Sequence, residues 1–521
     1  MKGIKNLIPA AKLVLAIALY LTFGSAISNA SDIYIAQNAA GANNGADCAD
    51  AYAVTWFNTA ANWGSGSGKI GPGTTAHLCG TFNGAAGSSM LTFYGSGTSG
   101  SPITLLWESG AVVQAPYFSA STYGINGQGA TYVTLNGGTN GIIQNTANGT
   151  GLTNSTASVL VGGFGSNLQV ENLSFLNVYV HLINDASGGG AHGLNLAGQS
   201  NVTVGPNNTF TQADVGIFDD WTSANSSNLT VYKNNFSAIN QDMEFGFYPA
   251  GTFTNVYIYG NTATNWVNWD DPGNDYHHNF VHVFTNLPGA SVTGNLQIYN
   301  NQVVGDMGSH ATSLIYMEND NGGTGGTMGT WYIFNNVLSK TNANVPASTG
   351  IVALVGVNNG FLVNNTIEDA GGSGSNAYNC VNIYQTGWTL KNNIEVGCGA
   401  YIYQQGATIA ASNNDYYGAA SPQWIWHSSF LSTLASWQSN CSCDANSIGT
   451  NPILTGTYVP NAGSPVIGVG TNLSSLDITA LNSDAVGVVR PSTAPWDMGA
   501  YQHASGSGTP TAPTTLAAIA H

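Results

Sequence analysis

The chain has very few charged side chains. Charged residues make up 6% of its 521 residues, with 8 Lys and Arg against 25 Asp and Glu, and the formal net charge is −17. Nucleic acids and anionic membranes bind basic surfaces, so this composition argues against both as partners. Low charge beside 67 Gly resembles a disordered chain, but 43% hydrophobic residues and 24 Tyr predict a packed core instead.

Long apolar runs are also scarce. Residues 13–23 (LVLAIALYLTF) are apolar throughout but too few to span a bilayer. Lysines precede this stretch and small residues follow it at 24–30, which is the pattern of a secretory signal peptide and its cleavage site. We therefore expect the protein to be secreted and to act extracellularly or at the cell surface. No later segment is apolar enough to predict a membrane span.

Helical periodicity is nearly absent, and a short β-type pattern recurs in its place. Each copy has a few alternating apolar residues, an Asn or a pair of Asn, and another apolar residue. The copies are VYKNNF (231–236), IYGNTA (258–263), IYNNQV (298–303), IFNNVL (333–338), LVNNTI (362–367) and LKNNIE (390–395). The recurring Asn, read as the second of each pair, is Asn235, Asn301, Asn336, Asn365, Asn393 and Asn414, with Asn261 between the first two.

These repeats predict an all-β fold, a parallel β-helix. The copies alternate in steps of two and are rich in β-branched and aromatic residues, as strands are. Stacked parallel coils bring equivalent positions about 4.8 Å apart, so an Asn repeated at one turn can form a ladder of amide hydrogen bonds. Asn also tolerates the left-handed backbone of a tight corner. In such a repeat fold, each unit buries its apolar face against its neighbours.

Six cysteines in an exported chain predict disulfide bonds. Cys48 and Cys79 would staple the N-terminal end, and Cys380 and Cys398 lie about one coil apart. Cys441 and Cys443 are too close in sequence for an ordinary bridge, so we expect each to pair elsewhere. A zinc site is the alternative, although no His stands at ligand spacing.

Both ends of the repeat region resemble known proteins. The segments PGTTAHL (72–78), SGTSGSPITLLWESGA (96–111) and DAVGVVRPSTAPWDMGAYQH (484–503) are similar to those of secreted bacterial right-handed β-helix proteins in the pectate-lyase-like superfamily. The resemblance covers nearly all of 32–503. It implies a right-handed solenoid with capped ends, since open ends would polymerise through exposed strand edges. Many activities share this fold, so the resemblance does not imply one of them.

We expect five segments along the chain. They are a signal peptide (1–30), an N-terminal cap with the first coils (31–110), the parallel β-helix (111–420), a C-terminal capping segment (421–503) and a flexible tail (504–521). A short helix is predicted at 426–439, where Leu431, Leu434 and Trp437 recur at helical spacing.

Several ionisable residues fall at equivalent places before the repeated turns. If each lies on the strand preceding its turn, period-two alternation points Glu244 and His282 outward while their apolar neighbours face the core. The expected catalytic face carries Asp219, Asp220, Glu244, His282 and Glu318. The expected substrate-binding residues are His192, Trp221, Tyr248, Trp269 and Tyr316.

Paired carboxylates on such a face suit glycoside hydrolysis. Adjacent coils separate equivalent groups by about 5 Å, as in retaining enzymes, and two coils by about 10 Å, near the inverting range. Asp219 or Asp220 with Glu244 fits the first case, and Glu244 with Glu318 fits the second. The alternative is that these are solvated residues on an exposed sheet.

A polar insertion at 265–279 (NWVNWDDPGNDYHHN) lies next to this face. Its carboxylates, Asp270, Asp271 and Asp275, are weak candidate ligands for calcium, although their spacing matches no EF-hand loop. The alternative is a surface loop with a DPG turn. No other cofactor is indicated.

A polysaccharide lyase is less favoured. The pectate lyases that the chain resembles typically use an Arg or Lys base beside calcium, yet the only arginine, Arg490, lies in the terminal segment. On the coils the lysines are Lys233, Lys340 and Lys391. We therefore predict a monomeric, polysaccharide-degrading glycoside hydrolase that acts on a neutral or weakly charged glycan. The alternatives are a non-catalytic adhesin or matrix protein that binds cell-surface glycans, and a lyase.

Overall fold

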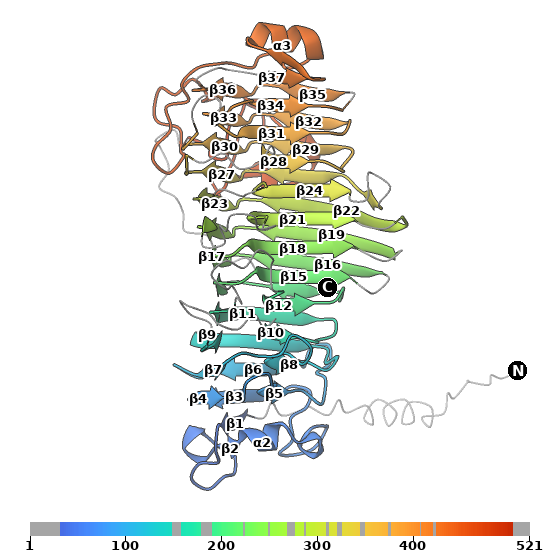
Figure 1. The fold of residues 1–521 in the computed structure, drawn as a ribbon, viewed down its shortest axis with the longest axis vertical. Helices are drawn as coiled ribbons and strands as arrows, with labels where there is room; N and C mark the ends of the chain where they lie inside the picture. Colours follow the sequence, from blue (N-terminus) through green and yellow to red (C-terminus); the bar gives the residue numbers. More distant parts are fainter. Residues whose placement is uncertain are drawn as a thin grey trace, which may run out of the picture.

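The computed structural model shows a tall stack of strands (Figure 1). It describes residues 32–147, 158–178, 190–221, 225–247, 251–267, 277–285, 288–308, 312–319, 326–343, 350–372, 377–406, 408–419 and 424–503. The predicted signal peptide and tail lie outside these residues. No helix among the residues described is long and apolar enough to cross a membrane. The five segment boundaries and secretion itself therefore stay predictions.

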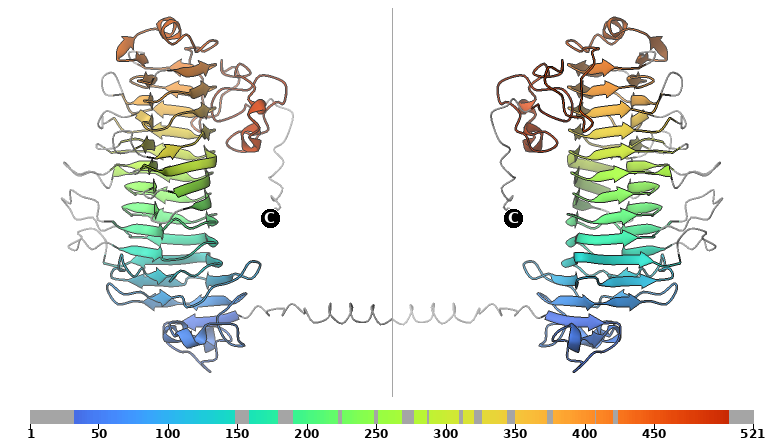
Figure 2. Two further views of the ribbon diagram at one scale, coloured as in Figure 1. Left: turned by 90° about the vertical axis from the view of Figure 1, so that its right-hand side faces the viewer. Right: turned by 90° about the vertical axis from the view of Figure 1, so that its left-hand side faces the viewer.

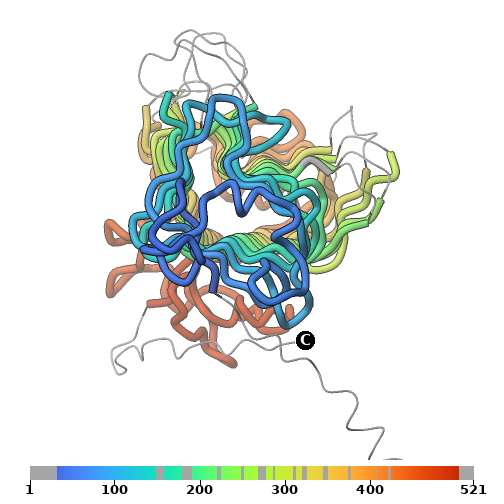
Figure 3. Tube along the Cα trace, turned by 90° about the horizontal axis from the view of Figure 1, so that it is seen from below, coloured from blue at the N-terminus to red at the C-terminus, as the bar shows by residue number. Residues whose placement is uncertain are grey.

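The chain folds as a parallel β-helix, which confirms the predicted architecture. One coil consists of β18 (Gln241–Phe247), β19 (Gly251–Tyr259) and β20 (Thr262–Thr264), and the next begins with β21 (Asn279–Thr285). Strands pair in parallel with the equivalent strands of adjacent coils and form a sheet of 25 strands and a sheet of 13. Seen along the axis, successive coils superimpose (Figure 3). Parallel crossovers of this kind are right-handed.

The interior consists of rows of apolar side chains, one from each coil. Because alternate residues of a strand face opposite sides, every second residue enters the core. One such row runs through consecutive strands of the 13-stranded sheet, and all its members are at most 1% exposed. It contains Ile217, Met243, Val281, Ile315, Val352, Val381 and Ile402.

The predicted asparagine ladder closes one corner of every central coil. Each ladder side chain donates from Nδ2 to Oδ1 of the next, at 2.9 to 3.2 Å, and also to a backbone carbonyl. The residue before it has a left-handed backbone, as at Asn300, where φ is 54°. The ladder members are Asn208, Asn234, Asn261, Asn301, Asn336, Asn365, Asn393 and Asn414.

The position of the ladder in one coil differs from the prediction. Asn234 and not Asn235 is the buried member, and Asn235 is exposed. In this coil Lys233 takes the left-handed position, with φ of 51°. The second Asn of the pair is therefore the first residue of β17 (Asn235–Ser237). The ladder also continues beyond Asn414, whose Nδ2 donates to the Asp444 carboxylate at 3.0 Å.

The segments at both ends of the described part pack against the stack. At the N-terminus, β1 (Asp32–Ala36) pairs with β3 (Thr75–Cys79), beside the short helix α2 (Val54–Phe57). At the other end, α3 (Leu434–Cys441) lies over the last coil (Figure 1), and the segment after it returns alongside the coils (Figure 2).

The predicted helix at 426–439 was wrong in its first half. The chain there forms a hairpin of β37 (Trp424–Trp426) and β38 (Ser429–Leu431), and α3 starts only at Leu434. Thr433 sets this start, since its side chain accepts a hydrogen bond from the Ser436 backbone at 3.1 Å.

Two predicted disulfides are present and one prediction was wrong. Cys48 bonds to Cys79 and Cys380 to Cys398, with Cα atoms 5.6 and 5.5 Å apart. Cys441 and Cys443 pair with each other, contrary to expectation. Ser442 between them has a left-handed backbone (φ 52°) at the end of α3, and the Cα atoms of the two cysteines lie 5.1 Å apart.

One core row contains a carboxyl group. Glu395 follows Ile367 in the interior row and is completely buried, and neither of its carboxylate oxygens has a hydrogen-bond partner among the described residues. Burial raises the pKa of Glu395 well above its usual value, and the negative charge of Asp444 raises it further. The protonated form is therefore the one that the fold stabilises.

We expect the ladder to make a large contribution to stability. Asn301→Ala removes the acceptor of both donors of Asn261, and each buried donor left unpaired costs about 1–3 kcal/mol. Asn235→Ala is the matched control at the exposed neighbouring position and should cost no more than about 0.5 kcal/mol. Urea unfolding measures both. Equal losses in the two variants would contradict the ladder's role.

Glu395 should make stability depend on pH. Since its pKa is raised in the folded state, its favourable contribution is complete below the pKa of the unfolded chain and is lost as pH rises toward the folded value. Glu395→Met should therefore stabilise the protein increasingly with pH, by up to about 1.4 kcal/mol per unit. Thermal unfolding between pH 5 and 8 measures this. Ile367→Met is the control with no pH-dependent effect, and a pH-independent result for Glu395→Met would refute the assignment.

Candidate active site

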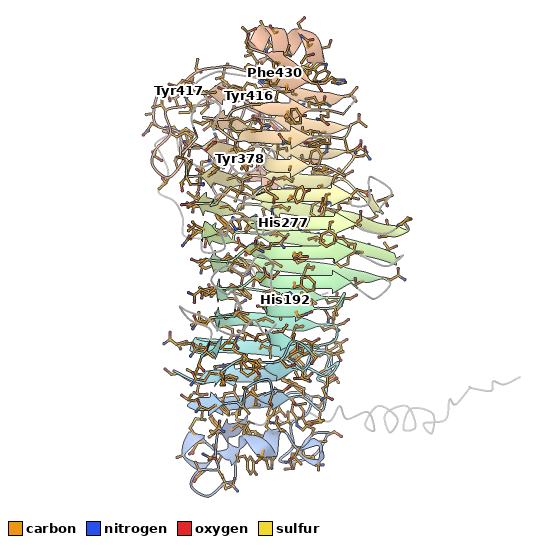
Figure 4. All side chains as sticks on the ribbon, viewed as in Figure 1. His192, His277, Tyr378, Tyr416, Tyr417 and Phe430 are labelled. Atoms are coloured by element: carbon orange, nitrogen blue, oxygen red, sulfur yellow. A yellow bond between two sulfur atoms is a disulfide. The ribbon has the colours of Figure 1, made fainter. Side chains whose placement is uncertain are left out.

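The candidate residues lie on the outer face of the 13-stranded sheet. Its relevant strands are β12 (His192–Leu196), β15 (Val215–Trp221), β18, β21 and β24 (Ile315–Asn319). Their register places one residue of each strand in a single outward row, and His192 and His277 mark this face in Figure 4. The row consists of Asn195, Phe218, Glu244, His282, Tyr316 and Ala353.

A continuous chain of hydrogen bonds joins three coils on this face. Gln241 Nε2 donates to Glu244 Oε2 at 3.0 Å, and Gln241 Oε1 lies 3.1 Å from His282 Nδ1. His282 Nε2 lies 2.9 Å from Glu318 Oε1, and the Tyr316 hydroxyl donates to Glu318 Oε2 at 2.7 Å. The hydrogen bonds therefore join Glu244, His282, Tyr316 and Glu318, with Gln241 as an additional link. Glu318 lies two residues along β24 from Tyr316, which is the residue opposite His282, so Glu318 is not at the position equivalent to Glu244 that was expected.

Aromatic rings hold His282 in place. Its ring stacks on Tyr316, with centroids 5.0 Å apart, and on His277 at 5.4 Å. The His282 side chain is nearly buried, whereas the Glu318 side chain remains 21% exposed. The imidazole is thus fixed in orientation while the carboxylate is accessible from solvent.

The environment of Glu318 favours its ionised form. Burial alone would raise the pKa, but hydrogen bonds from His282 and Tyr316, with the positive charges of His282 and His277, outweigh burial and lower the pKa below its usual value. Both ring nitrogens of His282 face oxygen acceptors when Gln241 donates to Glu244. His282 therefore links Gln241 on β18 to Glu318 on β24.

Asp219 does not share the outward row of Glu244. It lies opposite Phe245 rather than Glu244, is 2% exposed, and accepts a hydrogen bond from the Gly198 backbone at 2.8 Å. Neighbouring residues of a strand face opposite sides, so the slot opposite Glu244 belongs to Phe218. Asp219 therefore faces the opposite side of the sheet from Glu244, whereas the expected pair required both on one face. The backbones of Asp220 and Trp221 pair with Gly246 and Phe247, and their side chains lie outside the description.

His192 lies two coils before Glu244. Its ring stacks on Phe218 with centroids 4.2 Å apart, and burial lowers the pKa of His192 to about 4. It is therefore neutral near pH 7 and suits packing or hydrogen bonding better than charge interactions.

The remaining candidates lie outside the described residues. These are Tyr248 and Trp269, with the calcium candidates Asp270, Asp271 and Asp275. Within the described ranges, no group of three His, Cys, Asp or Glu side chains is arranged to hold a metal ion. The calcium and zinc hypotheses gain no support from the described part.

Two of the basic residues considered for a lyase have structural contacts. Lys340 is fully buried and its Nζ lies 2.9 Å from the Asp369 carboxylate. Arg490, 3% exposed, donates to Asn335 Oδ1 at 2.9 Å and ties the terminal segment to a coil corner. Both cations are therefore away from the outer face that carries Glu244.

Two contributing residues were not predicted as site residues. Gln241 is the first residue of β18, where the alternation that marks a strand has barely begun. Only the folded coil shows that its side chain contacts both Glu244 and His282. His277 was seen only as part of the polar insertion, and it stacks on the site from the end of that insertion.

These features define a class of protein, a parallel β-helix with a hydrogen-bonded carboxylate and imidazole cluster on one outer face. No family model matches the chain, and no curated protein matches it in sequence. Among solved structures, it is similar to the pectate lyase Pel9A, with a TM-score of 0.40 and 17% identity, covering 91% of this chain and 98% of that one. It is also similar to the GH136 lacto-N-biosidase from Eubacterium ramulus, with a TM-score of 0.38 and 12% identity, covering 84% and 71%.

The hydroxyl of Tyr316 should keep the pKa of Glu318 low. Tyr316→Phe removes the hydrogen bond to the carboxylate, so the pKa of Glu318 should rise. The chain has only six glutamates, so carboxyl ¹³C labelling of glutamate allows each to be titrated. Tyr403→Phe, on the same sheet but farther along it, should leave the Glu318 titration unchanged. An unchanged titration in Tyr316→Phe would show that the hydrogen bond is not maintained in solution.

Proposed function

We propose that this protein is a secreted carbohydrate-active enzyme that hydrolyses a neutral or weakly charged glycan on the outer face of the 13-stranded sheet. The observation that carries the proposal is the chain of hydrogen bonds from Glu244 through Gln241 and His282 to Glu318. These hydrogen bonds gather ionisable side chains on one face of a protein that has very few charged residues. Perturbed carboxylates in such clusters are typical of catalytic sites.

The two glutamates have different roles in the proposed reaction. Glu318 has the lowered pKa and acts as the base that takes a proton from the attacking water. Glu244, two coils away, acts as the acid that protonates the oxygen of the departing sugar. Two coils separate the strands by about 10 Å, and Glu318 lies a further two residues along its strand from the position equivalent to Glu244. This separation leaves room for a water molecule and favours inversion of configuration.

The neighbours of the glutamates position them. His282 bridges Glu318 and Gln241, and the Tyr316 hydroxyl holds the second oxygen of the Glu318 carboxylate. Gln241 fixes the orientation of the Glu244 side chain through its amide. The excess of acidic residues over the whole chain disfavours strongly anionic polysaccharides as substrates.

Reducing-sugar release from a panel of neutral polysaccharides tests the proposal. Glu318→Gln and Glu244→Gln should each lower kcat/KM by about 100-fold or more, because general acid or base catalysis contributes that much. Glu171→Gln is the matched control. Glu171 is a half-buried acid on β11 (Leu168–Leu176), where its Oε1 accepts from Asn136 at 2.7 Å, and the Gln oxygen can accept the same bond. Full activity in Glu318→Gln would rule out the assigned base.

Two other results would replace hydrolysis by one of the alternatives. Glycan or cell binding without any sugar release by the wild type would favour an adhesin or matrix protein. A rise in ultraviolet absorbance from unsaturated products would favour a lyase. Lys340 and Arg490 are buried in structural contacts, so the base would come from the outer-face cluster, from Lys233 or Lys391, or from residues outside the described ranges.

A further inference from the structure

A second polar and aromatic surface lies on the long strands of the other sheet. Its strands are β16 (Ser226–Tyr232), β19, β22 (Ala290–Tyr299), β26 (Trp331–Phe334) and β29 (Gly360–Val363). One outward row is a stack of aromatic rings at intervals of 5.2, 4.8 and 4.8 Å. Its members are Tyr232, Tyr259, Tyr299 and Phe334.

In the neighbouring outward row, one glutamine interrupts a run of aromatic residues. It runs from Thr230 through Tyr257, Gln297 and Tyr332 to Phe361. Tyr332 stacks on Phe361 at 4.9 Å, so only its other face turns toward Gln297. Tyr257 stacks on no ring among the described residues. Tyr257 and Tyr332 therefore lie two coils apart, about 10 Å from strand to strand, and the slot between them has Gln297 at its base.

The returning C-terminal segment forms the outer wall of this slot. Residues 476–480 enclose, with the strands, a cleft of about 390 Å³ that is also lined by Tyr257, Gln297, Tyr299 and Tyr332. Figure 2 shows the segment standing beside the coils. The volume falls within the range of small-molecule sites.

The groups in the cleft suit a neutral ring bearing hydroxyl groups. Gln297 and Asn295 offer amide donors and acceptors, and Tyr299 and Asp477 add a phenol and a carboxylate to the lining. No Lys or Arg lines the cleft, which disfavours an anionic ligand. Aromatic faces pack against the C–H faces of sugars, and amides and carboxylates hydrogen-bond their hydroxyls.

We propose that this cleft is a second saccharide-binding site, in which one sugar ring of a neutral glycan lies between Tyr257 and Tyr332 above Gln297. The site stands on a different sheet from Glu244 and Glu318. It holds the glycan without cleaving it and lengthens the contact between the protein and its polymer. It does not depend on the proposed hydrolytic activity.

Filling the slot tests the proposal. Gln297→Tyr completes the row of rings, so it should leave the fold as stable as in the wild type and block the site. Thr230→Tyr is the matched control, since it adds a ring to the same row on the far side of Tyr257, outside the cleft. Isothermal titration with neutral cello-, xylo-, manno-, malto- and galacto-oligosaccharides measures binding in the full chain, and oligogalacturonate serves as the anionic comparison. All variants carry Glu318→Gln to prevent turnover.

The wild-type cleft should bind at least one neutral series better than oligogalacturonate. Gln297→Tyr should weaken that binding about tenfold or more, with an unchanged melting temperature, while Thr230→Tyr keeps it. A Gln297→Tyr variant without Glu318→Gln should still release sugar from short substrates if the proposed hydrolysis is correct. The proposal fails if no neutral series binds, or if Gln297→Tyr binds as well as Thr230→Tyr.

Discussion

The stacked asparagine amides are the interaction on which the rest of the structure depends. A tight corner in every coil leaves buried backbone donors and acceptors that must be satisfied. Each ladder Asn satisfies such groups, because it accepts from the backbone N–H of the preceding ladder residue and donates to a carbonyl and to the next amide. The ladder therefore fixes the register of every coil against its neighbours. A fixed register determines which side chains share a row, on the inside and the outside alike.

Because the register of the coils is fixed, the few charged residues of this chain can serve two purposes. Several ionisable groups hold the scaffold together. Lys340 pairs with Asp369, Arg490 binds a coil corner, and Asp444 ends the amide ladder. The outer face of the 13-stranded sheet, by contrast, brings Glu244 and Glu318 into one hydrogen-bonded cluster from segments over 70 residues apart in sequence. The chain needs no charged loop to make this cluster, because coil stacking supplies the proximity.

The sequence was sufficient for the fold, and it indicated which residues of the candidate site face outward. Period-two alternation with a repeated Asn predicted the β-helix, and the same alternation pointed Glu244 and His282 outward between buried neighbours. It could not distinguish Asn234 from Asn235, since both are Asn and Lys233 is an uncommon left-handed residue. A shift of one residue moves a side chain to the opposite face, so Asp219 was assigned to a slot that Phe218 occupies. The returning C-terminal segment has no repeat, so its packing against Tyr299 and Tyr332 was not predictable.

The central claim is that coil stacking builds a glycan-processing site between Glu244 and Glu318. A crystal structure of Glu318→Gln with a neutral oligosaccharide substrate tests this most directly. We expect a glycosidic oxygen within hydrogen-bonding distance of Glu244 and a water or sugar carbon facing residue 318. Sugar bound only elsewhere, or an outer face covered by other residues with no space for a ligand, would contradict the account.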